Sequence, residues 1–373
     1  MNYSKRQIEL NAQFQLGMNA HLNESDIEIR FYPFTSSVLT SFCKENLLSS
    51  EDEKITENIS FTYPVFLPRK LKKTDKAILL LHGLNERNWN KYLTWAEYLC
   101  KETRKPVILF PIAFHMNRSP ITWSNPRALQ NLIDLRRKRN GTDRSLSFAN
   151  VALSERIWEN PSRFYKSGRQ SLNDLAQLSK DIKTGIHPLF SENTQIDIFS
   201  YSIGSFLSQV TIMTNPEGLF SDSKLFMFCG GSIFSSMFGE SRSIMDKPAF
   251  DRLLQYYMND FCREVGPDSF CDKVYKSFFS MISPDKSKDE RELFFKQLGN
   301  RIEGISLEKD KVIPYRGIVE ALGSDNAKSR ISLLDFSFSY SHENPFPIGQ
   351  NYDSTEVDLS FNQVFSQAVQ FLT

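Results

Sequence analysis

Apolar and polar residues follow two rhythms along this chain, which predict a repeated exchange between strands and helices. Short unbroken apolar runs predict buried strands, and apolar residues three or four positions apart predict helices that bury one face. By the first criterion, and by period-two alternation in the last case, we expect strands at residues 59–67, 77–81, 107–111, 196–199, 224–229, from 305 onward and within 331–340. By the second criterion we expect helices at residues 88–103, 171–184, 250–265, 271–282, 288–298, 315–322 and 361–371.

One strand–helix–strand unit indicates the class of fold. Residues 77–81 are five consecutive apolar residues, a predicted helix follows at 88–103, and the next apolar run is 107–111. Strands joined by a helix of this length lie parallel in one sheet. We therefore expect an α/β protein with a mostly parallel central sheet flanked by helices.

The pattern divides the chain into four stretches. Residues 1–58 are mixed and polar, and we expect them to form an N-terminal extension that packs on the body of the protein. Residues 59–232 and 301–373 contain the predicted strands and are expected to form the α/β core. Residues 233–300 are helical in pattern and carry many aromatic residues, so we expect a helical insertion there.

A strand that runs directly into a helix carries the first candidate for chemistry. Residues 196–204 read Ile-Asp-Ile-Phe-Ser-Tyr-Ser-Ile-Gly, which predicts a strand and a sharp turn with Ser202 at its apex. Such a turn projects a serine hydroxyl above the sheet, and the next backbone N–H helps to bind an oxyanion. The usual pattern is Gly-x-Ser-x-Gly; here Ser200 stands at the first glycine position and Gly204 keeps the second. A serine-rich loop without chemistry is the alternative interpretation.

A candidate acid and a candidate base follow Ser202 along the chain. Asp310 comes after a short apolar run, where a carboxylate can orient a histidine and stabilise its protonated form. Asp335 and Asp197 are rival acids, although both lie within predicted strands. His342 follows the last predicted strand and precedes the final helix.

These features occur in an order that points to a known family. Residues 77–83 read Ala-Ile-Leu-Leu-Leu-His-Gly, a buried strand that ends in a His-Gly loop before a helix. Together with the serine turn, the acid loop and the late histidine, this loop resembles the α/β-hydrolase superfamily over roughly residues 60–373. Within it the chain is similar to uncharacterised bacterial members rather than to a named lipase or peptidase. The resemblance also implies that the insertion at 233–300 is a cap over the active site.

The resemblance implies a role for individual residues. Ser202 would be the nucleophile, His342 the general base and Asp310 the acid that fixes the histidine tautomer. The backbone N–H groups of Leu84 and Ile203 would form the oxyanion hole.

Side chains near the predicted strand ends are candidates for a substrate pocket. They are His82, Asn85, Tyr201, His115, Arg118 and Trp123. Arg118 could bind an anionic group, and Trp123 could form an apolar wall. Alternatively, His115, Arg118 and Trp123 anchor a long surface loop, and His82 supports the loop on which it lies.

Composition excludes several functional classes. The net charge of +1 gives no electrostatic footprint for nucleic acid, and the basic run 136–139 is interpreted as a solvated helix end. The five cysteines form no CxxC pair and no ligand spacing with the five histidines, so we expect reduced thiols, no metal and no organic cofactor. Without an apolar signal core or a long apolar run, we expect a cytoplasmic protein with no membrane span.

The sequence thus predicts a serine hydrolase that cleaves a carboxylic ester, or a related acyl bond, of a small molecule. An acyltransferase or peptidase on the same scaffold is one alternative. A non-catalytic binding protein that kept the fold is another, because fold does not imply function. Neither the substrate nor the oligomeric state is indicated by the sequence.

Overall fold

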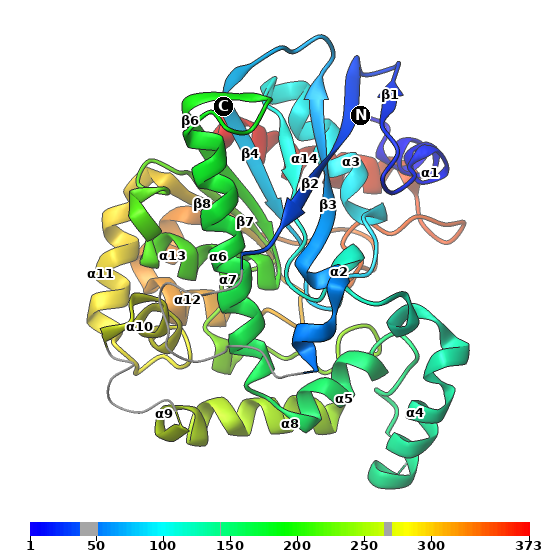
Figure 1. Ribbon diagram of the computed structural model, residues 1–373, viewed down its shortest axis with the longest axis vertical. Coiled ribbons are helices and arrows are strands. Elements are labelled where there is room, and N and C mark those ends of the chain that lie inside the picture. Colours follow the sequence, from blue (N-terminus) through cyan, green and yellow to red (C-terminus); the bar gives the residue numbers. More distant parts are fainter. Residues whose placement is uncertain (38–50, 142, 265–270) are drawn as a thin grey trace.

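A mixed sheet forms the centre of the molecule, and the computed structural model describes residues 1–37, 51–141, 143–264 and 271–373. Within these residues nine strands are hydrogen-bonded in the order β1-β2-β3-β5-β4-β6-β7-β8-β9 (Figure 1). The strands are β1 (Ala20–Leu22), β2 (Ile27–Thr35), β3 (Ser60–Pro68), β4 (Thr74–Leu81), β5 (Val107–Leu109), β6 (Phe190–Tyr201), β7 (Leu225–Phe228), β8 (Ile302–Leu307) and β9 (Ile331–Leu334).

The sheet is parallel except at one edge. Strand β4 pairs in parallel with β5 and β6, and the parallel pairing continues through β7, β8 and β9. Strands β1, β2 and β3 are antiparallel to their neighbours. The parallel pairing of β4 with β5 confirms the predicted strand–helix–strand unit, and the mostly parallel sheet expected from the sequence is confirmed.

Helices cover both faces of this sheet. Those in the described residues are α1 (Tyr3–Gln13), α2 (Thr56–Ile59), α3 (Asn90–Thr103), α4 (Pro126–Asn140), α5 (Val151–Glu159), α6 (Arg163–Lys183), α7 (Ile203–Thr214), α8 (Lys247–Gln255), α9 (Phe261–Glu264), α10 (Lys273–Ser280), α11 (Lys288–Leu298), α12 (Tyr315–Leu322), α13 (Ser324–Arg330) and α14 (Ser354–Leu372). Helices α1, α3 and α14 pack against one another on one face, whereas α6 and α7 pack against β6 on the other. Figure 1 shows α4, α5, α8 and α9 together at the bottom of the view, below the sheet.

Successive residues of the central strands enter two separate cores. Along β4, Ile78 and Leu80 belong to the core under α3 and α14, whereas Leu79 and Leu81 belong to the core under α6 and α7. All four side chains are fully buried. Burial on both faces explains why this strand is an unbroken apolar run rather than an alternating one.

The last predicted strand is shorter than the sequence pattern suggested. Strand β9 ends at Leu334, opposite Leu307, which is the last residue of β8, so the ladder has no further residue of β8 to pair with. Beyond that point the rings of Phe336 and Phe338 stack, with centroids 5.3 Å apart, and both residues lie in the core. The alternation up to residue 340 therefore comes from buried aromatic residues in a loop, and the prediction of a strand there was wrong.

The N-terminal residues join the sheet directly. Strand β2 pairs with β3 along its length, and β1 adds an outer edge strand. Residues 38–50, which include Cys43, lie outside the described residues, as do Val265 and Phe270 of the expected insertion.

One arginine of the basic run 136–139 is buried, which corrects its interpretation as solvated. Arg136 on α4 is fully buried, and its guanidinium binds Asp246 at 2.6 Å and Glu155 at 2.5 Å. These ion pairs tie α4 to α5 and to the start of α8. A helix end that looks solvated in sequence is thus an anchor of the helical layer below the sheet.

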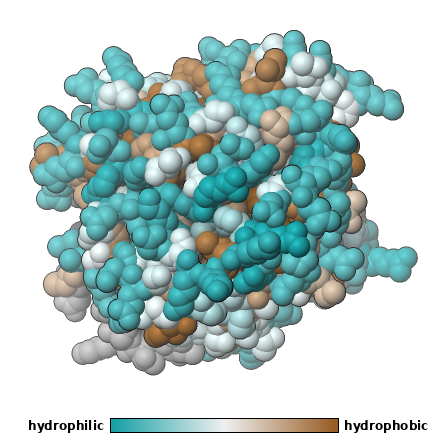
Figure 2. Space-filling view, turned by 90° about the horizontal axis from the view of Figure 1, so that it is seen from above, coloured by the Kyte–Doolittle hydropathy of each residue, from teal (hydrophilic) through white to brown (hydrophobic). Residues whose placement is uncertain are grey.

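The surface is mainly hydrophilic on the face shown in Figure 2, where hydrophobic residues are scattered among polar ones. None of the helices in the described residues has both the length and the apolar character needed to cross a bilayer. The described cysteines, Cys100, Cys229, Cys262 and Cys271, are free thiols.

A buried histidine links α6 to the antiparallel edge of the sheet. The His187 ring lies 4.6 Å from that of Tyr32, its Nε2 is 3.0 Å from the Tyr63 hydroxyl, and its Nδ1 accepts a hydrogen bond from the Leu189 N–H. Because Nδ1 is an acceptor, the ring is neutral. Burial lowers the pKa of His187 to about 4.

We expect this histidine to make stability depend on pH. Between its folded pKa of about 4 and an unfolded value near 6.5, the unfolded chain binds a proton that the folded chain does not, so the free energy of unfolding falls as the pH falls. From pH 7 to pH 5 the loss is about 2 kcal/mol for one such group. Urea denaturation at pH 7 and at pH 5 measures this loss. We expect the loss to be smaller by about 2 kcal/mol in His187→Gln than in the wild-type protein. The control is His21→Gln, whose side chain is 65% exposed; an equal change in both variants would contradict the prediction.

Candidate active site

A strained turn joins strand β6 to helix α7 at Ser202. This residue has φ 56° and ψ −124°, a left-handed conformation that non-glycine residues rarely adopt. It is buried, with 4% exposure, and its N–H donates to the Phe228 carbonyl on the neighbouring strand. Strain of this kind persists only where the surrounding structure fixes it, and it concentrates at functional sites.

Small residues around Ser202 make the turn possible. A Cβ on Gly204 would lie 2.7 Å from the Leu81 carbonyl oxygen, and a Cβ on Gly230 would lie 2.2 Å from the Ser205 Oγ. Ser200, at the first position of the motif, is fully buried and its hydroxyl donates to the Phe226 carbonyl at 3.2 Å. The serine is tolerated in place of glycine because its one polar group is satisfied.

Ser202, His342 and Asp310 form one hydrogen-bonded chain. The Ser202 Oγ lies 2.7 Å from His342 Nε2, and His342 Nδ1 lies 2.7 Å from Asp310 Oδ2. A carboxylate accepts only, so Nδ1 carries the proton and Nε2 is left to accept from the serine hydroxyl. The other oxygen of Asp310 accepts from the Val312 and Ile313 N–H groups, both at 2.9 Å.

Tyr201 fixes the histidine rather than lining a pocket, which corrects its place among the pocket candidates. Its hydroxyl donates to the His342 carbonyl, and the two rings stack with centroids 5.4 Å apart. The residue is fully buried at the end of β6. Its side chain points to the face of the sheet opposite to Leu81, where the last loop of the chain passes.

The two rival acids are engaged elsewhere. Asp335 accepts from the Tyr340 hydroxyl at 2.7 Å and pairs with Lys309 at 2.9 Å on the surface. Asp197 pairs with the buried Lys105 at 2.9 Å, near the start of the parallel part of β6. Neither carboxylate contacts His342 within the described chain.

Two backbone donors next to the serine have no internal acceptor. In the described residues neither the Leu84 N–H nor the Ile203 N–H donates a hydrogen bond to another protein group. Both residues line one apolar cavity of about 60 Å³. Donors left free beside a serine hydroxyl are what an oxyanion hole requires.

The loop that carries Leu84 is braced from helix α3. The Gly83 N–H donates to the Tyr92 hydroxyl at 2.9 Å, and this hydroxyl donates to Glu86, which also pairs with Lys91. This brace has no signal in the sequence, because the tyrosine and lysine look like ordinary residues of a first helical turn.

Two small cavities lie near the serine turn: Ile203, the residue after Ser202, lines one of them, and the two share four lining residues. One is apolar and includes Phe206 and Phe278; the other is more polar and includes Arg87, Arg156 and Arg163. Each measures about 60 Å³. The shared residues are Leu84, His115, Phe164 and Ser167.

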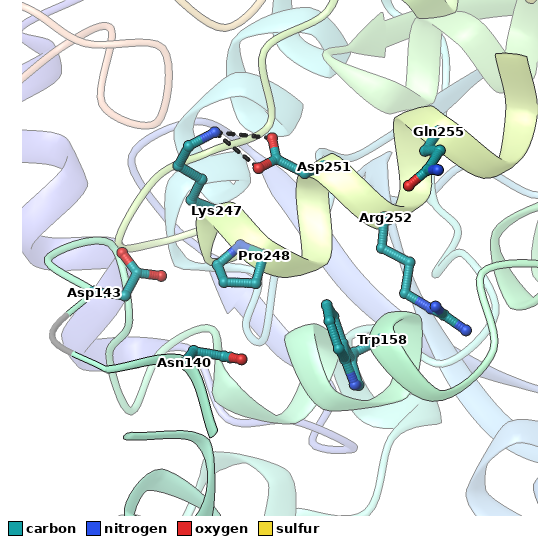
Figure 3. Close-up of a pocket in the computed structure, with 8 residues that line it drawn as sticks. All are labelled: Asn140, Asp143, Trp158, Lys247, Pro248, Asp251, Arg252 and Gln255. Carbon is teal, nitrogen blue, oxygen red and sulfur yellow. Dashed lines mark hydrogen bonds and ion pairs between the residues drawn. The ribbon is translucent and has the colours of Figure 1, made fainter. Parts of the chain in front are cut away.

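A larger cavity of about 530 Å³ lies elsewhere, among the ends of α4, α5 and α8 (Figure 3). In Figure 3 the Lys247 and Asp251 side chains bind each other, and Arg252 lies beside Trp158, at 5.3 Å from its ring centroid. None of Ser202, His342 and Asp310 lines this cavity. These three residues line neither of the two smaller cavities, but Leu84 and Ile203, which carry the two free N–H groups, line the apolar one.

Three of the six pocket candidates line the polar cavity: Asn85, His115 and Trp123. Asn85 also ties the loop after β4 to the helical layer, because its Nδ2 donates to the Ala149 and Ser243 carbonyls, both at 2.7 Å. The Trp123 ring lies under the Arg156 guanidinium at 4.4 Å.

His82 does not line either cavity, which corrects its prediction as a pocket residue. It is fully buried; its Nδ1 donates to the Gly83 carbonyl at 2.8 Å and its Nε2 accepts from the Ile112 N–H at 2.9 Å. Burial lowers the pKa of His82 well below its usual value. The neutral ring links the loops that follow β4 and β5.

Arg118 is also structural, which corrects its prediction as an anion-binding residue. It is fully buried, and its guanidinium donates to the Pro111 and Asn58 carbonyls and to Asp174 at 2.6 Å. The same group stacks on the Phe61 ring at 4.3 Å. The side chain has no exposed surface, so it is not open to a substrate anion.

Two cavity residues carried no sequence signal. Arg156 on α5 and Arg163 on α6 line the polar cavity, and both pair with Asp52, at 2.8 and 3.0 Å. Their positions depend on how the two helices pack, which no motif records. In the described residues no group of three or more His, Cys, Asp or Glu side chains is arranged to hold a metal ion.

Comparisons with known proteins agree with this architecture. A family model described as "Family of unknown function (DUF6051)" matches residues 1–373. No curated protein matches the chain. Among solved structures the chain is similar to a bacterial heroin esterase, at 11% identity, with 100% of this chain and 90% of that chain covered and a TM-score of 0.50. It is also similar to an esterase from Pyrobaculum calidifontis, at 11% identity, 98% and 91% coverage and a TM-score of 0.46.

At these identities the similarity concerns the fold. The chain has the α/β-hydrolase fold, as the order of its motifs led us to expect.

The close packing at the turn leads to a stability prediction. In Gly204→Ala the new methyl group would meet the Leu81 carbonyl, so we expect a loss of about 1–3 kcal/mol in the free energy of unfolding. In Gly168→Ala, within α6, a Cβ meets nothing within 4 Å, and we expect a gain of about 0.5–1 kcal/mol. Urea denaturation of both variants measures the difference; similar stabilities would show that the turn is not tightly packed.

Proposed function

Because the chain belongs to the family of unknown function DUF6051, we propose its function from the site itself: a serine hydrolase that cleaves a carboxylic ester, or a related acyl bond, of a small molecule. The observation that supports this most strongly is the hydrogen-bonded chain from Ser202 through His342 to Asp310, with both links at 2.7 Å. The strained backbone at Ser202 supports it too, since it aims the hydroxyl at Nε2.

The first half of the reaction forms an acyl-enzyme. His342 Nε2 takes the proton of the Ser202 hydroxyl as its oxygen attacks the carbonyl carbon. The free N–H groups of Leu84 and Ile203 stabilise the negative charge on the carbonyl oxygen, and loss of one such donor costs about 3–4 kcal/mol in a well-studied protease. The bond to the leaving alcohol then breaks, and the alcohol oxygen takes the proton from His342.

Water completes the cycle. His342 removes a proton from a water molecule, whose oxygen attacks the acyl carbon, and the Ser202 oxygen leaves and regains that proton. Asp310 stays ionised throughout and stabilises the imidazolium through its hydrogen bond to Nδ1. Its own charge is held by the Val312 and Ile313 N–H groups, so the carboxylate needs no rotation during the cycle.

The division of the chain follows from this role. We place the α/β core at residues 59–232 and 301–373, the cap at 233–300 and the N-terminal extension at 1–58. Asn85 supports the cap assignment, because its side chain holds Ser243 of that segment directly against the loop of the proposed oxyanion hole. The apolar cavity beside Ile203 suits a compact acyl group.

Covalent labelling tests the nucleophile. We expect a fluorophosphonate to add once to the wild-type protein, as seen by intact-mass spectrometry, and not to add to Ser202→Ala. Turnover of a short-chain aryl ester should fall by several orders of magnitude in that variant. The control is Ser329→Ala, an exposed serine that should label as the wild type does. Retained turnover in folded Ser202→Ala would refute the assignment, and a wild type that neither labels nor turns over would favour a binding protein.

Two aspartates allow a matched test of the acid. Asp310→Asn should lower kcat by roughly 10⁴-fold, because the amide cannot hold the Nδ1–H tautomer. Asp335→Asn, in the loop after β9 and paired with Lys309, should leave kcat within about twofold. Steady-state kinetics on one aryl ester measures both variants, and equal effects would rule out a specific role for Asp310.

A further inference from the structure

His115 is a buried histidine with an acceptor that no protein group uses. It is 8% exposed, and its Nδ1 donates to the Ala113 carbonyl at 2.8 Å. With the proton on Nδ1, the lone pair at Nε2 is an acceptor. Within the described residues Nε2 has no hydrogen-bond partner, and the residue lines both of the small cavities.

The neighbouring histidine shows how such a ring is satisfied when its role is structural. His82 lies 5.4 Å away between ring centroids, carries its proton on the same nitrogen and uses Nε2 to accept from the Ile112 N–H. The two rings therefore have the same tautomer and comparable burial. They differ in that the Nε2 of His115 has no partner in the described residues, and leaving a buried acceptor unpaired is unfavourable.

The backbone around His115 is held in a costly conformation. Both flanking residues, Phe114 and Met116, have positive φ, 64° and 50°. Three hydrogen bonds fix this segment: the Ala113 N–H donates to Ser171, the Phe114 N–H to Asn58 and the Met116 N–H to the Glu86 carbonyl. A strained segment that is fixed this thoroughly sets the direction of the ring between its two ends.

The charge around the polar cavity selects the kind of donor that can bind. Three arginines, Arg87, Arg156 and Arg163, line it together with one acid, Glu86; in the described residues the guanidinium of Arg87 donates to the Phe148 and Ala149 carbonyls. This cationic lining disfavours an ammonium group. Burial lowers the pKa of His115 to about 4, so near neutral pH the ring stays an uncharged acceptor for a neutral O–H or N–H.

We propose that His115 is a specificity-determining residue: its Nε2 accepts a hydrogen bond from a neutral hydroxyl or amide N–H on the part of the ester that enters the polar cavity. The preferred substrates are then esters with one compact apolar half, seated beside Phe206 and Phe278, and one half that carries a hydrogen-bond donor. This inference rests on the proposed function, and it adds the substrate class.

Matched esters test the inference. The probes are aryl butyrates in pairs that carry a hydroxymethyl or an ethyl group at the same ring position, with each ring position represented. We expect the wild-type protein to favour the hydroxymethyl member of at least one pair by roughly tenfold or more in kcat/KM, since a hydrogen bond to a buried acceptor is lost with the ethyl member. In His115→Phe, which removes the acceptor but keeps a flat ring, this ratio should fall to about one.

A second variant separates loss of the acceptor from damage to the loop. The amide oxygen of His115→Gln reaches the region of Nε2, so this variant should regain a ratio above one. His187→Gln, remote from both cavities, should keep the wild-type ratio. Thermal unfolding of each variant checks that it is folded.

Three results would overturn the inference. A wild type that is labelled at Ser202 and hydrolyses both members of every pair equally would refute the role of His115 while leaving the proposed function intact. An unchanged ratio in folded His115→Phe would do the same. A wild type that is neither labelled nor hydrolytic would refute the proposed function, and the specificity with it.

Discussion

The architecture depends on keeping a serine in a left-handed backbone conformation between β6 and α7. Residues in such conformations cost about 1–3 kcal/mol each, so the surroundings must leave them no alternative. Here β6 is an inner strand, with β4 on one side and β7 on the other. The carbonyl of Phe228 accepts the Ser202 N–H, and the absence of a Cβ at Gly204 lets the helix start against the end of β4. The strain is therefore held within the buried inner part of the sheet.

This placement also decides what the site can be. Parallel strands present their carboxyl ends at the same edge, so loops from β4, β6 and β8 meet there although they are far apart in sequence. A buried carboxylate in such a place is costly unless every oxygen has a partner. Asp310 meets this condition with two backbone N–H groups and His342. The Tyr201 hydroxyl holds the histidine backbone, so the elbow strand positions both the serine and its partner ring.

The sequence predicted the strands that run through the core and the order of serine, acid and histidine, because both are recorded locally as apolar runs followed by small or polar residues. It misjudged features whose cause is distant. Arg118 looked like an anion-binding residue because its partner, Asp174, lies on a helix that no motif connects to it. The alternation up to residue 340 looked like a strand because period two reports alternate burial, which stacked phenylalanines in a loop also produce. Pairing between segments is fixed by packing. Packing depends on residues that are far apart in sequence, so it cannot be predicted from any one segment.

His82 and His115 show how the same chemistry is divided between stability and selectivity. Both are buried neutral imidazoles on the loops after β4 and β5, and both carry the proton on Nδ1. The Nε2 of His82 accepts a hydrogen bond from the Ile112 N–H and thereby links the two loops that flank the site. His115 lies on the loop after β5, whose backbone is already fixed by other hydrogen bonds, so its acceptor is not needed for folding. A scaffold that is rigid without a given polar atom leaves that atom available for recognition. This is the physical reason to look for selectivity at His115 rather than at Ser202 and its partners, which every acyl substrate must use alike.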